Sequence, residues 1–145
     1  MTYVLVSIIG MWNLIYAFSK ENKKKVAFLL MVIVWILFWG SYNNPDYGNY
    51  IRHYRSLQLG ANIFVRSGAE FGYRILMKMA ISIGLSYEHF LAIITLFGYL
   101  LIHSTVKKYS NDYNFVYLLY FIYPFFFDVV QVRNFLIMAI FIYAI

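Results

Sequence analysis

Carboxylate side chains are the groups of this sequence that could act as a general base and take a proton from a substrate hydroxyl. Glu88 follows Ser86, a predicted helix cap, and therefore belongs to a helix start. Glu70 and Asp128 each have an arginine four or five residues further along the chain that could neutralise them. Asp46 has no such partner in the sequence, so it is the best candidate for the base.

Arginines form a second set of candidate groups, because a guanidinium binds phosphate or carboxylate through two parallel hydrogen bonds. A lipid-linked diphosphate at a membrane surface would suit them. The alternative is that these side chains reach lipid headgroups, and it fits Arg52, Arg55 and Arg66. Arg133 is harder to explain in this way, because it lies between two apolar runs, where charged residues usually have a function.

The segment YNNPDYGNYIRHY at 42–54 is dense in tyrosine and contains an Asn-Pro turn signal. Tyr47, Tyr50 and Tyr54 recur at spacings of three and four, so they share one face of a helical turn. Their rings could stack on sugars, and their hydroxyls could bind glycan oxygens. The alternative is a belt of tyrosines at a membrane interface. The sequence alone leaves both interpretations open.

The composition indicates a membrane protein. Hydrophobic residues make up 63% of the 145 residues and charged residues only 12%, with a mean hydropathy of +0.66, whereas soluble proteins carry about 25% charged residues. The net charge is +6, and the basic residues lie between apolar runs. This position favours a role in membrane orientation and in binding anionic lipid over a role in binding nucleic acid. With no cysteine and no metal-ligand spacing among the histidines, we expect no disulfide, metal site or cofactor.

The apolar runs predict an all-α polytopic membrane protein with about four to five membrane helices and one amphipathic helix in the interface. The amphipathic helix is predicted over 70–83, within an extracytoplasmic loop at 42–85. The last apolar run is too short to span a bilayer, so we expect residues 1–145 to form one membrane domain that is the N-terminal part of a larger bundle. The predicted spans are about 2–18, 26–41, 88–106, 114–127 and 134–145.

The positions of the basic residues predict the orientation. Lysines are concentrated in the short connections near 20–25 and 107–108, while arginines dominate the loop at 42–85 and the break near 124–133. Because positive charges in short loops mark the cytoplasmic side, the N-terminus and the loop at 42–85 are predicted to be extracytoplasmic.

Four segments in series resemble the EpsG family, Wzy-like membrane proteins of bacterial exopolysaccharide and capsule synthesis. They are NPDYGNY at 44–50, EFGYRILMK at 70–78, LSYEHFLAIITL at 85–96 and YFIYPFFFDVVQVRNFLIMAIFIYAI at 120–145. The resemblance implies a multi-pass protein of the bacterial inner membrane with roughly ten helices, of which this chain is the N-terminal portion. It also implies polymerisation of polyprenyl-diphosphate-linked oligosaccharide repeats at the outer membrane face. The implied partners are that lipid-linked substrate, membrane lipid and other polysaccharide-assembly membrane proteins.

In this interpretation Asp46 takes a proton from the attacking sugar hydroxyl, and Arg74 and Arg133 stabilise the departing diphosphate. Two alternatives remain open: a flippase for the same lipid-linked glycan, and a non-catalytic or truncated, inactive membrane subunit. The candidate substrate-binding residues are Tyr47, Tyr50, Tyr54, Glu70, Tyr73, Asp128 and Gln131.

Overall fold

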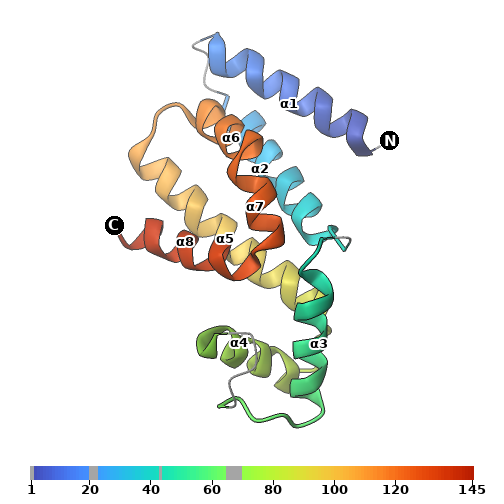
Figure 1. Cartoon of the computed structure of the whole chain (residues 1–145). Coiled ribbons are helices and arrows are strands. Elements are labelled where there is room, and N and C mark those ends of the chain that lie inside the picture. The colour runs from blue at the N-terminus through green and yellow to red at the C-terminus, as the bar shows by residue number, and fades with distance from the viewer. Residues whose placement is uncertain (1, 20–22, 43, 65–69) are drawn as a thin grey trace.

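The chain folds into helices joined by short connections (Figure 1). The computed structural model describes residues 2–19, 23–42, 44–64 and 70–145, and within these ranges there are eight helices and no strand. The prediction of an all-α fold is therefore confirmed. The helices are α1 Thr2–Phe18, α2 Lys24–Trp39, α3 Tyr47–Gln58, α4 Phe71–Ser82, α5 Tyr87–Tyr109, α6 Tyr113–Ile122, α7 Pro124–Val130 and α8 Val132–Ala144.

Helix α5 lies at the centre of the bundle and contacts α2, α6 and α8 (Figure 1). It begins as the sequence predicts, because the backbone N–H of His89 donates to the Ser86 hydroxyl, 3.3 Å away. Glu88 in its first turn and lysines in its last turn both match the direction of the helix dipole. The preceding turn uses Gly84, whose φ of 78° suits glycine.

Three aromatic residues from different helices form the centre of the core. The rings of Phe38, Tyr99 and Phe135 lie with their centroids 5.0 to 6.0 Å apart, and all three are almost fully buried. Gly98 on α5 allows this packing, since a Cβ at that position would lie 2.5 Å from a ring carbon of Phe135. The missing side chain therefore lets α8 approach α5 closely.

Helix α1 covers α2 and α6 and is joined to them by a buried pair of asparagines. The side-chain amide of Asn114 donates to Asn13 Oδ1 at 2.7 Å, and the amide of Asn13 donates to the Asn114 carbonyl oxygen at 2.6 Å. The backbone N–H of Lys23 also donates to Asn114 Oδ1. These bonds satisfy polar groups that would otherwise be costly to bury.

The C-terminal part of the chain changes direction twice. Helices α6 and α7 meet at an angle of 55° at Tyr123, and α7 begins with Pro124, whose missing N–H is tolerated in the first turn of a helix. A second break at Gln131 separates α7 from α8. These breaks return α8 across α5 instead of extending the line of α6.

Within the described part, α5 is the one helix that is long and apolar enough to cross a membrane alone, and the bent α6–α7 pair also qualifies if taken as one span. Only 39% of the apolar stretch of α5 is buried inside the bundle. Large apolar side chains such as Ile93, Phe97 and Leu100 are exposed on its surface. This outward apolar face suits lipid better than water, while the multi-pass arrangement of the remaining helices stays a prediction.

The region 42–85 holds two helices, α3 and α4, which pack against each other at one end of the bundle (Figure 1). Helix α4 occupies the segment where an amphipathic helix was expected. Helix α3 extends the expected helical turn of tyrosines into three turns, and it buries Tyr50, Tyr54 and Leu57 against its neighbours.

Candidate functional site

Arg133 lies at the start of α8, where α8 meets the α3–α4 end of the bundle. Its Nε–H donates to the Tyr50 hydroxyl at 3.2 Å, and its guanidinium carbon lies 5.6 Å from the centre of the Tyr50 ring. The guanidinium also forms an ion pair with the Glu70 carboxylate. We call Arg133, Glu70, Tyr50 and Tyr73 the arginine site.

Two segments position the other residues of the arginine site. Tyr50 stands one turn into α3, and Glu70 has extended backbone (φ −63°, ψ 149°) immediately before α4 begins. Tyr73 on α4 meets Tyr50 edge to face, with ring centroids 5.8 Å apart. Each of these two tyrosines is 5% exposed. Tertiary packing therefore brings together four of the residues that the sequence suggested for the site.

The ion pair of the arginine site is at the protein surface. The side chain of Arg133 is 25% exposed and that of Glu70 is 59% exposed. A pair that is so open to solvent contributes only about 0–1 kcal/mol to stability. A phosphate can therefore replace Glu70 as the partner of Arg133. A guanidinium has five donors and binds a phosphate in two-point geometry, which is the stronger interaction.

Neither of the two ion pairs that sequence proximity made possible forms between these described side chains. Asp128 does not neutralise Arg133, and Glu70 does not pair with Arg74; Glu70 pairs with Arg133 instead. Glu70 precedes the first turn of α4, so the spacing of four residues does not place it on the helix face of Arg74. Arg74 itself is buried, with 5% of its surface exposed.

Asp128 is part of a buried polar chain that the sequence did not reveal. The Tyr120 hydroxyl donates to Asp128 Oδ2 at 2.7 Å, and the Tyr120 and Tyr99 hydroxyls lie 3.2 Å apart. Asp128 is 7% exposed and is bonded at the level of Tyr99, in the middle of α5. In the sequence, this contact is indicated by the spacing of eight residues between Tyr120 and Asp128. Because the helix breaks at Pro124, that spacing could not be used to predict the contact.

Asp46 and Tyr47 lie at the beginning of α3, one turn before Tyr50. The side-chain amide of Asn49 lies 3.5 Å from Asp46 Oδ1, at the limit of a hydrogen bond. The Tyr47 hydroxyl donates to Glu88 at 3.3 Å. Burial first, and then the negative charge of Glu88, raise the pKa of Tyr47 to about 12. Tyr47 therefore stays a neutral donor that ties α3 to the start of α5.

The predicted sugar-stacking surface of tyrosines is not open. Tyr54 is 1% exposed, and its hydroxyl donates to the carbonyl oxygen of Leu85 at 2.8 Å. Burial also raises the pKa values of Tyr54 and Tyr73. Tyr50 presents its ring to Arg133. The face shared by these residues is therefore the packing face of α3, and it does not offer free rings to a ligand.

The remaining candidates have simpler surroundings. Gln131 is exposed at the break before α8, where its side-chain oxygen accepts from the amide of Asn134. Arg52 is exposed and bonds within α3, to the carbonyl oxygen of Gly48 and to Asn49. Arg66 lies outside the described residues. In the part of the chain that the structure covers, no group of three or more His, Asp or Glu side chains is placed to hold a metal ion.

Comparison with known proteins gives one match. A family described as the EpsG family matches residues 25–145, which is most of the chain and includes every residue of the arginine site. Neither a curated protein nor a solved structure matches the chain.

Proposed function

The chain belongs to the EpsG family, membrane proteins related to exopolysaccharide biosynthesis, and from this premise we propose that it joins lipid-linked oligosaccharide repeats into a polymer. The repeats are carried on a polyprenyl diphosphate and are joined at the outer face of the bacterial cytoplasmic membrane. In this proposal the chain is the N-terminal portion of a multi-pass bundle, with the arginine site at the outer face.

The proposed reaction is a displacement at an anomeric carbon. A hydroxyl oxygen of one repeat attacks the anomeric carbon of a second repeat, and the bond from that carbon to the diphosphate oxygen breaks. Asp46 takes the proton of the attacking hydroxyl. Arg133 stabilises the negative charge on the departing diphosphate. Buried Arg74 adds positive potential, and exposed Gln131 offers an amide to sugar hydroxyls.

The placement of Arg133 is the observation that carries this proposal. It is a partly exposed guanidinium held from two sides, by the Tyr50 hydroxyl and the Glu70 carboxylate. These two contacts fix the orientation of the Arg133 guanidinium before a substrate binds. The weak ion pair also lets an incoming diphosphate replace Glu70.

Asp46 is the best base among the carboxylates at the α3–α4 end of the bundle and near it. Glu70 is paired with Arg133, Glu88 accepts from Tyr47, and Asp128 is buried with Tyr120. Asp46 accepts only a long contact from Asn49 among the described side chains, and it is one turn from Tyr50. It is therefore free to accept a proton from a sugar hydroxyl.

A carrier of the same lipid-linked glycan is the second candidate. Buried Asp128 favours it, because acidic residues in the middle of apolar helices are typical of transport pathways. A carrier moves the glycan between leaflets without changing its length, whereas a polymerase lengthens the glycan and releases polyprenyl diphosphate.

The decisive experiment reconstitutes the protein in vesicles with a radiolabelled polyprenyl-diphosphate-linked oligosaccharide. We expect a ladder of longer glycans and release of polyprenyl diphosphate. Movement of unchanged substrate between leaflets would support the carrier instead. No product and no movement, in vesicles that contain folded protein, would leave the chain as a non-catalytic subunit and reject both activities.

A further inference from the structure

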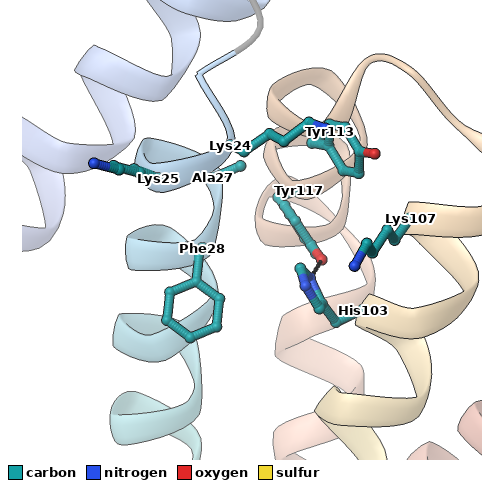
Figure 2. A pocket seen from close by; sticks show the side chains of 8 residues that line it. All are labelled: Lys24, Lys25, Ala27, Phe28, His103, Lys107, Tyr113 and Tyr117. Atoms are coloured by element: carbon teal, nitrogen blue, oxygen red, sulfur yellow. Dashed lines mark hydrogen bonds between the residues drawn. The ribbon is translucent and has the colours of Figure 1, made fainter.

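A pocket with a volume of about 330 Å³ lies at the opposite end of the bundle from the arginine site, where α2 begins, α5 ends and α6 begins (Figure 2). Its size falls at the lower end of the range for small-molecule sites. We call it the lysine pocket. Its lining residues are Lys24, Lys25, Ala27, Phe28, His103, Lys107, Tyr113 and Tyr117.

The lysine pocket is positively charged, and none of the described residues that line it carries a carboxylate. Lys24, Lys25 and Lys107 form no ion pair with any acidic residue that the structure describes. The Lys24 ammonium lies 5.3 Å from the centre of the Tyr113 ring. In Figure 2 the Lys107 ammonium points toward His103 and Tyr117, whereas Lys25 extends away from them. Helices α2 and α6 also begin here, and their dipoles attract negative charge.

The pocket also has polar and apolar walls. His103 Nδ1 and the Tyr117 hydroxyl lie 2.5 Å apart in one wall, between α5 and α6 (Figure 2). Phe28 on α2 is 47% exposed, and its ring lies 5.8 Å from the ring of His103. A ligand that suits both walls has an anionic head for the lysines and a hydrocarbon part for the exposed phenyl ring.

We propose that the lysine pocket binds an anionic phospholipid, with the headgroup phosphate between Lys24 and Lys107 and an acyl chain along Phe28. Lysine suits this role, because its ammonium is a compact charge that follows a mobile phosphate. The pocket is at the end of α5, where headgroups lie if this apolar helix spans the membrane. The site is independent of the proposed polymerase activity.

Lipid binding is measured with the full chain in detergent micelles by native mass spectrometry, using dioleoylphosphatidylglycerol as the probe. We expect a dissociation constant at least about fivefold lower than that of dioleoylphosphatidylcholine, which has a neutral headgroup. Each contributing lysine is worth a factor of about five. The double variant Lys24→Ala/Lys107→Ala should therefore bind phosphatidylglycerol roughly twentyfold more weakly, and Lys24→Arg/Lys107→Arg should retain binding.

Lys108→Ala is the matched control, since Lys108 adjoins Lys107 but lies over the Tyr109 ring, 4.6 Å from its centre, and does not line the pocket. We expect it to change binding less than twofold. Equal losses for Lys107→Ala and Lys108→Ala would overturn the proposal, because diffuse surface charge would then explain binding. Equal affinity for the two lipids would also overturn it.

Binding of glycerol 3-phosphate tests whether the pocket binds a lipid or a free phosphate. We expect it to bind at least tenfold more weakly than phosphatidylglycerol, and Phe28→Ala to weaken only lipid binding, because the ring contacts the acyl chain. Binding of glycerol 3-phosphate as tight as that of the lipid would reject a lipid as the occupant. Circular dichroism of each variant checks that the helices are retained.

Discussion

The two ends of the bundle both present basic side chains, but they hold them in different ways. At one end, Arg133 is fixed by Tyr50 and Glu70, which come from α3 and from the turn before α4. At the other end, Lys24 and Lys107 project from helix ends into a pocket without acidic partners among the described residues. A guanidinium held by its neighbours presents its donors to a ligand in one fixed direction, whereas an ammonium group mainly supplies a point charge. The chemistry is therefore expected at the arginine end.

Replacing Arg133 should give the largest difference in polymer output between substitutions at the two ends of the bundle. Arg133→Ala removes the group that we propose to stabilise the leaving diphosphate, and loss of one such donor lowers rates by about 10²–10³-fold. Arg133→Lys should restore little, because an ammonium lacks the two-point geometry. Polymer produced by cells that depend on the variant chain, normalised to its amount in the membrane, measures the effect.

Arg52→Ala and Lys107→Ala are the controls for this experiment. Arg52 is an exposed arginine on α3 that bonds only within its own helix, and Lys107 belongs to the opposite end. We expect both to retain polymer output within about twofold. An output of Arg133→Ala equal to that of these controls would remove Arg133 from the reaction and with it the difference between the ends.

Gly98→Ala should alter the packing of the core and thereby shift the helix that carries Arg133. The added methyl group would lie 2.5 Å from a ring carbon of Phe135, which is fully buried and cannot easily move. Overpacking of this kind costs about 1–3 kcal/mol. Because Phe135 lies two residues after Arg133, the shift of α8 should also lower polymer output by about tenfold. Thermal unfolding followed by circular dichroism measures the stability change.

Gly72→Ala is the matched control, because a Cβ at Gly72 would meet no atom within 4 Å and α4 is a helix that gains from alanine. We expect its stability to be unchanged or slightly higher. Phosphatidylglycerol binding in the lysine pocket should survive Gly98→Ala. Equal loss of function at both ends would instead mean that the bundle responds as one unit.

The sequence predicted the helices better than it predicted the contacts between them. Apolar runs and the Ser86 cap have local causes, so α2, α5 and the helical character of 70–83 follow from neighbouring residues. The pairing of Arg133 with Glu70 joins residues 63 positions apart, and only tertiary packing determines it. Asp128 shows the same limit, since Tyr120 and Tyr99 become its neighbours only after the chain turns at Pro124. Local spacing therefore identified the residues of the arginine site but did not predict which of them contact one another.

Asn114→Ala should weaken the lysine end and leave the arginine end intact. The change removes the Asn114 Oδ1 acceptor of the Lys23 N–H in a partly buried bond, and it removes the amide donor to Asn13 Oδ1 in a buried one. An unsatisfied buried polar group costs about 1–3 kcal/mol. We expect faster hydrogen exchange in α1 and weaker phosphatidylglycerol binding, because Tyr113 of the pocket is the preceding residue.

Asn111→Ala, in the exposed connection before α6, is the control and should leave exchange in α1 unchanged. Polymer output per molecule of Asn114→Ala should stay within about threefold of the unmodified chain. If Asn114→Ala left exchange in α1 as slow as in the unmodified chain, the asparagine pair would not be what holds this helix.

Tyr50→Phe should have the smallest effect and should test how firmly Arg133 is held. The change removes one hydrogen bond to the guanidinium and keeps the aromatic ring that lies 5.6 Å away. A hydrogen bond of this kind contributes about 0.5–1.5 kcal/mol, so the proposed reaction should slow by about twofold to tenfold. Tyr54→Phe is the matched control, because its hydroxyl bonds the Leu85 carbonyl oxygen and not Arg133. If the two variants lowered the rate equally, the hydroxyl of Tyr50 would have no special part in orienting Arg133, and Glu70 alone would have to account for the difference between the two ends.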